Sequence, residues 1–295
     1  MNAWKEGWFT EESNGLWDGE SKNLKVKQVL YHKKSEFQDV LVFESESYGN
    51  VLALDGAIQA TEKDECAYQE MACHLPLVTV GHEPKRVCII GGGDGGCVRE
   101  VLKHSSIEEV VLCEIDKEVI EAAKKFLPTM SCGLEDPRVK VINADGAAYL
   151  KQHKNYFDVI INDCSDPIEC AQVLFSKDFF ITCREALVPN GIFSQQSETL
   201  WLHLDFISNL KKDLEQVFDQ AKYAYVSTPT YPGGLLGFLV CSTNPDMDPS
   251  VPRRIESWYN KLDEKTKDSL KYYTDKLHTA SFHLPAFAAK KLNQF

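Results

Sequence analysis

The sequence is 295 residues long, about the length of two average domains, and can bury a sizeable hydrophobic core. Its formal net charge of -12 repels the phosphate backbone of nucleic acids and attracts small cations. No apolar run approaches the roughly 18 residues that cross a bilayer, and the N-terminus lacks a signal-peptide pattern. We therefore expect a cytoplasmic protein that binds neither nucleic acid nor membrane.

The first 60 residues alternate short apolar runs with turn signals. Val40 to Phe43 and Val51 to Leu54 are two such runs, and Asp55-Gly56 is a two-residue hairpin signal before a third, Ala57 to Thr61. The pattern predicts a small N-terminal β-domain over residues 1–62.

A helix is expected to link this domain to the rest of the chain. Residues 61–64, Thr-Glu-Lys-Asp, resemble a capping box, and Tyr68, Met71 and Leu75 recur at helical spacing. Beyond Arg86, apolar runs alternate with amphipathic helical patterns, which is typical of parallel α/β sheets. We predict a Rossmann-like, class I methyltransferase-like α/β domain over residues 63–295, with a helical C-terminal segment and a mostly parallel sheet of seven strands. The predicted strands are residues 87–90, 110–114, 139–142, 157–162, 191–194, 223–226 and 238–241.

The cysteines and histidines show no pattern of a disulfide or metal site. The 10 cysteines contain no C-x-x-C pair and several lie in apolar stretches, so we expect reduced, mostly buried thiols. The 8 histidines lack metal-ligand spacing, so we expect no metal.

A glycine-rich turn follows the first strand of the second domain. The run from Gly91 to Gly96 satisfies G-x-G-x-x-G, in which Gly91 and Gly93 let the backbone approach a nucleotide closely. Glu114 ends the next strand, where an acid can bind both hydroxyls of a ribose, and Asp145 follows the third strand, at the edge that faces an adenine. Each acid alone is equally well explained as a carboxylate at a helix start. Together they predict adenosine binding.

Asp94, inside the glycine-rich turn, discriminates between nucleotides. A dinucleotide would place its pyrophosphate at this helix start, where a carboxylate adds like-charge repulsion. Intact S-adenosylmethionine carries its own carboxylate near such a loop, whereas the decarboxylated form presents only an ammonium group. Asp94 therefore favours decarboxylated S-adenosylmethionine.

Two more acids, Asp163 and Asp166, follow the fourth predicted strand. Crevices in such sheets open at the carboxyl ends of the strands, so the two carboxylates can converge on one cation. The alternative is a capped turn, with Asp166 as N-cap and Pro167 as the first helical residue. Side by side and shielded from water, the two acids should raise each other's pKa, which makes Asp163 a better proton acceptor.

Other residues are candidates for the same pocket, although each alone is equally well explained as core or surface. Gln38 and Gln59 could reach the ribose or base. Cys164 with His203 as its base is not favoured as a nucleophile, because nothing in the sequence orients the pair. The candidates for an amine pocket are Tyr68, Gln69, Glu198, Trp201 and Tyr231, with Trp8 and Trp17 as apolar or cation–π walls.

Several stretches form a joint pattern that resembles the eukaryotic spermidine synthases, a family of polyamine aminopropyltransferases, over nearly the whole chain. Besides the glycine-rich turn and residues 163–167, these stretches are residues 7–9, 37–43, 48–52, 68–71, 201–203 and 229–232. The resemblance implies transfer of an aminopropyl group from decarboxylated S-adenosylmethionine, a co-substrate rather than a cofactor, to putrescine. It also implies a homodimer or tetramer, joined partly through the N-terminal β-domain.

Carried over position by position, the resemblance assigns a role to each candidate. Asp163 and Tyr68 would be catalytic, and Asp94 would hold the aminopropyl ammonium group. The nucleoside would be held by Gln38, Gln59, Gly91, Gly93, Glu114, Asp145 and Gly146. The diamine would be bound by Trp17, Tyr68, Gln69, Asp163, Asp166, Glu198 and Tyr231.

Three positions depart from the family pattern. Cys164 stands where a serine is usual, and Glu169-Cys170 stands where Gly-Pro is usual in the loop over the site. Trp17 is followed by Asp-Gly-Glu in place of Pro-Gly-Gln. Losing a proline loosens a loop, and Glu169 adds negative charge at the entrance, so these differences bear on loop closure and acceptor choice.

Three other functions are compatible with the same scaffold. They are a putrescine N-methyltransferase that uses intact S-adenosylmethionine, a nicotinamide-dependent dehydrogenase, and a weakly active or non-catalytic polyamine-binding subunit. Asp94 argues against the first two. The joint presence of Asp94, Tyr68, Asp163 and Asp166 argues against the third.

Overall fold

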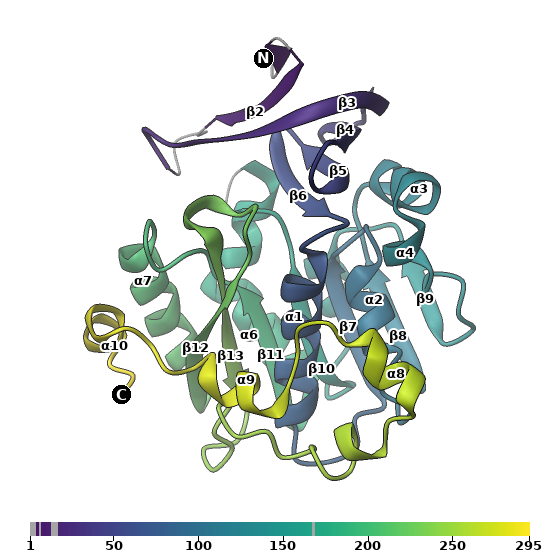
Figure 1. Cartoon of the computed structure of the whole chain (residues 1–295). Coiled ribbons are helices and arrows are strands. Elements are labelled where there is room, and N and C mark those ends of the chain that lie inside the picture. Colours follow the sequence, from purple (N-terminus) through teal and green to yellow (C-terminus); the bar gives the residue numbers. More distant parts are fainter. Residues whose placement is uncertain (1–3, 6, 13–16, 167–168) are drawn as a thin grey trace.

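The computed structural model describes residues 4–5, 7–12, 17–166 and 169–295, which form two sheets (Figure 1). The N-terminal sheet is a six-stranded antiparallel meander in the order β1-β2-β3-β4-β5-β6, which confirms the predicted β-domain. Its strands are β1 Trp4–Lys5, β2 Trp8–Glu12, β3 Ser21–Lys34, β4 Asp39–Ser45, β5 Gly49–Leu54 and β6 Ala57–Thr61.

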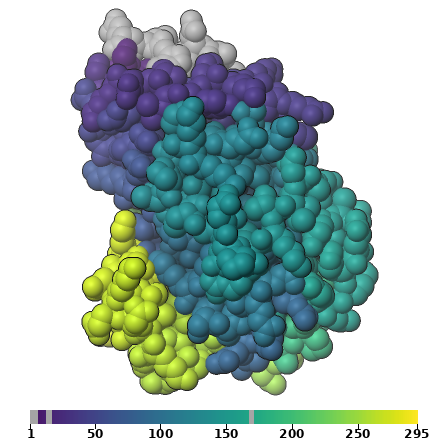
Figure 2. Space-filling view, turned by 90° about the vertical axis from the view of Figure 1, so that its right-hand side faces the viewer, coloured from purple at the N-terminus to yellow at the C-terminus, as the bar shows by residue number. Residues whose placement is uncertain are grey.

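The two faces of this meander pack against different partners. On one face, Phe9 and Phe43 are fully buried, with ring centroids 4.8 Å apart. On the other, Val42 and Leu52 pack against Val119 and neighbouring residues of the second domain. Figure 2 shows the N-terminal segments, in purple, resting directly on the teal middle of the chain. The N-terminal sheet is therefore held over the second domain by apolar contact.

The predicted hairpin at Asp55-Gly56 joins β5 to β6. Asp55 and Gly56 have φ values of 48° and 84°, the left-handed conformations that a tight hairpin turn requires. The Asp55 carboxylate also accepts a hydrogen bond from the backbone N–H of Asp39 at 2.8 Å. The turn chemistry thus fixes the register of the strands that overhang the second domain.

The linking helix, α1 Glu65–Thr79, begins later than the capping-box prediction implies. Asp64 is its N-cap residue but makes no side-chain capping bond. One Asp64 oxygen instead accepts from the Thr61 hydroxyl at 2.6 Å, and the other accepts from the N–H and hydroxyl of Thr230 at 2.9 and 2.7 Å. The residues that resemble a cap therefore tie the inter-domain link to a loop 166 residues further along the chain.

The second sheet has seven strands in the order β12-β13-β11-β10-β7-β8-β9, and β13 alone runs antiparallel to its neighbours. This confirms the predicted Rossmann-like sheet. The strand order reverses between β7 and β10, so the carboxyl ends of these two strands open a crevice. The strands are β7 Arg86–Gly91, β8 Glu109–Cys113, β9 Val139–Ile142, β10 Phe157–Asp163, β11 Leu187–Gln196, β12 Gln220–Ser227 and β13 Leu235–Ser242.

Helices cover both faces of this sheet (Figure 1). The helices α1 and α2 pack on one face together with residues 255–282 of the C-terminal segment, whereas α5, α6 and α7 pack on the other together with Leu292 of α10. The C-terminal segment, predicted to be helical, consists of short helices separated by loops. Among the described residues, no helix is long and apolar enough to span a bilayer. Beyond α1, the helices are α2 Gly96–Val101, α3 Lys117–Phe126, α4 Pro128–Ser131, α5 Gly146–Leu150, α6 Lys177–Ala186, α7 Leu204–Glu215, α8 Glu264–Ser269, α9 Asp275–Ala280 and α10 Ala286–Leu292, with 3-10 helices η1 Glu169–Phe175, η2 Pro232–Gly234 and η3 Tyr259–Lys261.

Candidate active site

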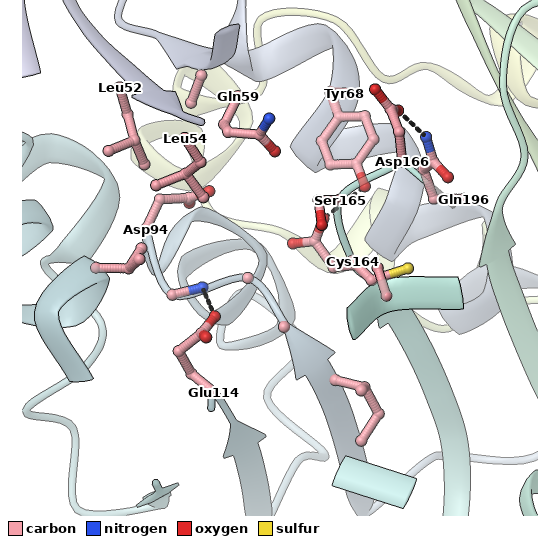
Figure 3. A pocket seen from close by; sticks show the side chains of 18 of the residues that line it. Leu52, Leu54, Gln59, Tyr68, Asp94, Glu114, Cys164, Ser165, Asp166 and Gln196 are labelled. Carbon is pink, nitrogen blue, oxygen red and sulfur yellow. Dashed lines mark hydrogen bonds between the residues drawn. The ribbon is translucent and has the colours of Figure 1, made fainter. Parts of the chain in front are cut away.

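A cavity of about 350 Å³ lies where the N-terminal sheet overhangs the carboxyl ends of the parallel strands (Figure 3). Leu52, Leu54 and Gln59 reach it from the N-terminal sheet, and Glu114 and Asp166 lie at opposite sides of it. The described lining residues include no lysine, arginine or histidine. The acidic ones are Glu11, Asp64, Glu65, Asp94, Glu114, Asp145, Asp163 and Asp166. The cavity is therefore suited to a cationic ligand with an apolar portion.

The glycine-rich turn runs from the end of β7 to the start of α2 and forms the floor of the cavity. Gly91 has φ +78°, and a Cβ there would lie 2.2 Å from the Asp163 carbonyl oxygen. A Cβ at Gly93 would lie 2.9 Å from the Glu114 side chain, and the Gly93 N–H donates to that carboxylate at 3.1 Å. The glycines are thus required by the close approach of β10 and of Glu114, whatever ligand is bound.

Glu114 and Asp145 both line the cavity but differ in what holds them. Burial raises the pKa of Glu114 to about 7, although it accepts hydrogen bonds from the N–H groups of Asp116 and Gly93. Asp145 caps α5 by accepting from the N–H groups of residues 147 and 148 at 2.8 and 3.3 Å. One oxygen of Asp145 is therefore used to cap a helix, as the alternative explanation expects. Asp145 nevertheless also lines the cavity.

The other candidates for the nucleoside line the cavity as well. The Gln38 amide donates to Asp116 at 3.0 Å, and the Gln59 amide donates to the Ala57 carbonyl at 3.4 Å. Gly146 has to be small, because a Cβ there would lie 2.6 Å from Ile90. All seven residues expected to hold a nucleoside therefore line the cavity.

Asp94 is buried in the turn, with one oxygen doubly hydrogen-bonded. Its Oδ1 accepts from the backbone N–H of Gly96 at 2.6 Å and from the side-chain amide of Gln69 at 2.8 Å. Burial, and then the negative charge of Asp163, raise the pKa of Asp94 to about 8. Gln69, which was expected in the diamine pocket, lines the cavity and places its amide against Asp94.

Asp163 is the last residue of β10, and Tyr68 reaches it from α1. The Tyr68 hydroxyl donates to Asp163 Oδ1 at 2.5 Å, while the buried Oδ2 has no hydrogen-bond partner among the described residues. Burial raises the pKa of Asp163, and the Tyr68 hydrogen bond opposes that rise. The tyrosine stays protonated, because burial and the neighbouring carboxylate raise the pKa of its hydroxyl.

The expected mutual rise in the pKa of Asp163 and Asp166 is not found among the main causes of either shift. The charge of Asp163 instead raises the pKa of Asp94. Asp166 belongs to a second group: burial and the charge of Glu198, with a smaller effect of Glu11, raise its pKa well above the ordinary range. Asp163 ends β10 whereas Asp166 lies beyond it in the loop, and both line the cavity.

The second acidic group is organised by Tyr231. Its hydroxyl lies 2.6 Å from Glu198 Oε2 and 3.0 Å from Asp166 Oδ1. Glu198 is buried and does not line the cavity, so it acts from behind Tyr231. The loop that carries Tyr231 is fixed by Asp64 and, at the Pro229 carbonyl, by Lys22 of β3 at 2.7 Å.

Glu11 is a cavity residue that the sequence analysis missed. Its Oε1 accepts from the Ile58 N–H at 3.0 Å, and its buried Oε2 has no hydrogen-bond partner among the described residues. Burial raises the pKa of Glu11 to about 7. The signal was available, because the two-residue period of β2 places Glu11 on the same inward face as the fully buried Phe9.

Three aromatic candidates do not line the cavity. Trp17 is buried, with its ring 6.5 Å from that of His203, whereas Trp8 is largely exposed. Trp201 is 58% exposed and packs against Phe287 at the surface.

The residues around Cys164 bear on two further expectations. Burial and the charge of Asp163 raise the pKa of Cys164 well above that of a free thiol, which disfavours a thiolate nucleophile. The expected helical position of Pro167 lies outside the described residues, as do the side chains of Glu169 and Cys170. Within the described part of the chain, no group of three or more His, Cys, Asp or Glu side chains is arranged to hold a metal ion.

Comparisons with known proteins agree with this architecture. Residues 65–250 match the spermine/spermidine synthase domain, and residues 7–62 match the spermidine synthase tetramerisation domain. The chain is 48% identical to a spermidine synthase of Dictyostelium discoideum over 99% of this chain and 100% of the relative. It is 50% identical to that of Schizosaccharomyces pombe, over 96% and 93% respectively.

Solved structures give the same result. A spermidine synthase in complex with the transition-state analogue AdoDATO matches with a TM-score of 0.90 and 37% identity, over 99% of this chain and 96% of that one. The enzyme from Thermotoga maritima matches with a TM-score of 0.88 and 38% identity, over 98% and 94%. The full-length matches and the cavity geometry together show that this chain belongs to the spermine/spermidine synthase family.

Proposed function

We infer that this chain transfers the aminopropyl group of decarboxylated S-adenosylmethionine to putrescine, producing spermidine and methylthioadenosine. The observation that carries this inference is a cavity with a nucleoside side at Glu114 and two separate acidic groups, with no cationic side chain among its described lining residues. The chain is thus an aminopropyltransferase, as are its near relatives by name.

The donor fits the half of the cavity around Glu114. We assign the ribose hydroxyls to Glu114 and the adenine edge to Asp145, with Leu52 and Leu54 as apolar walls. The aminopropyl ammonium group would then lie at Asp94, whose Oδ1 is already hydrogen-bonded. A carboxylate on the donor tail would meet like charge there, which favours the decarboxylated nucleotide.

The acceptor fits between the two acidic groups. Its attacking amine would lie at Asp163 and Tyr68, and its other amine at Asp166 and Tyr231, with Glu11 nearby. Two cationic ends require two anionic sites, so the presence of two acidic groups favours a diamine over a monoamine.

The reaction would be an in-line displacement in which the neutral amine attacks the methylene group next to the sulfonium. An alkylamine has a pKa near that of lysine, so freeing its lone pair at pH 7 costs roughly 4 to 5 kcal/mol. Asp163 accepts that proton, and its raised pKa makes it a better acceptor than an ordinary aspartate. Because the sulfonium is already an activated electrophile, positioning of the two substrates supplies most of the acceleration, and no cofactor is needed.

Assembly and location extend the proposal. The match of residues 7–62 to a tetramerisation domain supports an oligomer joined through the N-terminal sheet, for which we propose a homodimer or tetramer. We place the domain boundary between residues 62 and 63, because β6 ends at Thr61 and α1 begins at Glu65. A cytoplasmic location is supported by nine described cysteines that are all free.

The test is a product assay. The protein is incubated with putrescine and either decarboxylated or intact S-adenosylmethionine, and the amine product is identified by mass. We expect an added aminopropyl group with the decarboxylated nucleotide alone. An added methyl group with the intact nucleotide would establish the N-methyltransferase instead, and unchanged putrescine with both would leave a polyamine-binding subunit.

A further inference from the structure

The Gln69 side chain is clamped between the backbone of α2 and two charged groups. A Cβ at Gly96 would lie 1.9 Å from Gln69 Cδ, so the amide packs directly on that glycine. Gln69 Oε1 accepts a hydrogen bond from Arg99 at 3.1 Å, and Gln69 Nε2 donates to Asp94 at 2.8 Å. The amide therefore bridges an arginine outside the cavity to a carboxylate that lines it.

Arg99 is itself held from several sides. Its two terminal nitrogens donate to the two oxygens of Glu65 at 2.7 and 3.2 Å, a bidentate pair. Its Nε donates to Glu100 at 2.7 Å, and one terminal nitrogen also donates to the Thr129 carbonyl at 3.1 Å. These contacts occupy four of the five N–H groups of the guanidinium, and the fifth is held pointing at Gln69.

The chemistry of arginine settles which end of the Gln69 amide faces Asp94. A guanidinium only donates hydrogen bonds, so it can be satisfied only by the amide oxygen. The amide nitrogen must then face Asp94, which accepts as a carboxylate. With Gln69 and the Gly96 N–H both bound to Oδ1, Oδ2 is left for a cation in the cavity.

We propose that Arg99 is a positioning residue that sets the affinity for the cationic tail of the donor, by orienting Gln69 so that its amide nitrogen stabilises the ionised form of Asp94 that binds this tail. The proposal rests on the proposed function, because it takes decarboxylated S-adenosylmethionine as the ligand. It assigns a role in substrate selection to a residue that does not line the cavity.

The direction of the effect follows from the groups that face Asp94. These are Asp163 from β10, Glu65 and Gln69 from α1, and the Gly96 N–H and Arg99 from α2. Without the Arg99 contact, the Gln69 amide can rotate and present its oxygen to Asp94. An amide oxygen only accepts hydrogen bonds, so this arrangement favours the protonated form of Asp94. Donor binding needs the ionised form of Asp94, so donor affinity increases with pH as Asp94 loses its proton. Losing the Arg99 contact should shift this increase to higher pH.

The experiment is a double-mutant cycle on the full chain, with Arg99→Lys, Gln69→Met and both changes together. Arg99→Lys keeps the positive charge but cannot serve Glu65 and Gln69 at once. Binding of decarboxylated S-adenosylmethionine is measured by calorimetry across pH, and the KM for putrescine is measured by turnover. The matched control is Arg138→Lys, which alters another bidentate pair, with both bonds to Asp136 at 2.9 Å, outside the cavity lining.

We expect Arg99→Lys to weaken donor binding roughly tenfold at neutral pH, the loss typical of a hydrogen bond to a charged group. The pH at which donor affinity is half-maximal should rise, and the KM for putrescine should stay within about twofold of the wild-type value. In the Gln69→Met background, adding Arg99→Lys should change donor affinity little, because the group through which it acts is gone. Additive losses, an unchanged midpoint or an equal loss of putrescine affinity would overturn the proposal.

A second variant keeps the test decisive if Arg99→Lys does not fold. Gln69→Glu retains the partner of Arg99 but turns a carboxylate oxygen toward Asp94, so donor affinity should fall and the midpoint should rise. Donor binding equal to that of the wild type would overturn the proposal. Calorimetry reports binding without turnover, so a wild-type protein that binds the donor but makes no spermidine would refute the proposed function alone.

Discussion

Replacing Asp163 by asparagine changes both the acceptor side and the donor side of the cavity. The substitution keeps the shape of the side chain and removes its charge. Turnover should fall at least roughly 100-fold, the loss typical of removing a general base. The second effect is less direct, because Asp163 also raises the pKa of Asp94.

The size of that second effect can be worked from Asp94. With a pKa of about 8, Asp94 is about one-tenth ionised at pH 7, so its ionisation for donor binding costs about 1.4 kcal/mol. Asparagine at position 163 removes one of the causes of the raised pKa. The donor affinity of Asp163→Asn should therefore reach its half-maximal value at lower pH than that of the wild type.

The assay is calorimetric titration with decarboxylated S-adenosylmethionine from about pH 6 to about pH 9, beside a turnover measurement. Asp205→Asn is a suitable control, because that carboxylate is 87% exposed and pairs with Lys291 at the surface. A midpoint in Asp163→Asn at or above the wild-type value would refute the electrostatic coupling. Near-normal turnover would remove Asp163 from its role as proton acceptor.

Three further predictions concern other parts of the cavity. Glu11→Gln should raise the KM for putrescine about tenfold and leave donor binding unchanged, which steady-state kinetics with both substrates varied would show. Gly96→Ala should displace the Gln69 amide, because the new Cβ would lie 1.9 Å from it, so donor affinity and the melting temperature should both fall. Asp94 and Glu114 have folded-state pKa values of about 8 and 7, above their unfolded values, so they stabilise the ligand-free protein most below about pH 4 and progressively less as the pH rises to 8. Thermal melts without ligand should show that decline, and the donor should offset it most at the alkaline end; a melting temperature that rises over this range would contradict the assignment.

The sheet of the second domain could be predicted from sequence because its strands are buried runs bounded by polar turns. β7, for example, has four fully or nearly fully buried residues between Arg86 and Gly91. The glycine-rich turn was equally readable, although its glycines are explained by contact with Asp163 and Glu114 as much as by a ligand. The pattern of apolar and turn residues was sufficient to predict a feature wherever that feature depends only on one strand and the turn that follows it.

The grouping of side chains could not be predicted in the same way. Asp163 and Asp166 are near in sequence, but Asp166 is associated with Glu198, from the segment that follows β11, and with Glu11 of β2. Tyr68 and Gln69 are adjacent on α1, yet a helix turns about 100° per residue, so one reaches Asp163 and the other Asp94. Which side chains meet in the cavity depends on which helices and strands become neighbours in the fold. The periodicity of a single element carries no information about its neighbours.

The contacts of Asp64 and Lys22 with the loop at residues 229–230 have a consequence for how the cavity comes into being during synthesis. They join positions 166 and 207 residues apart in the chain. The residues assigned to the nucleoside all lie between Gln38 and Gly146, in the first half of the chain, so they can become ordered before the second half has left the ribosome. The diamine side also needs Glu198 and Tyr231, which are synthesised much later, so a nascent chain can acquire a nucleotide pocket well before it can discriminate among amines.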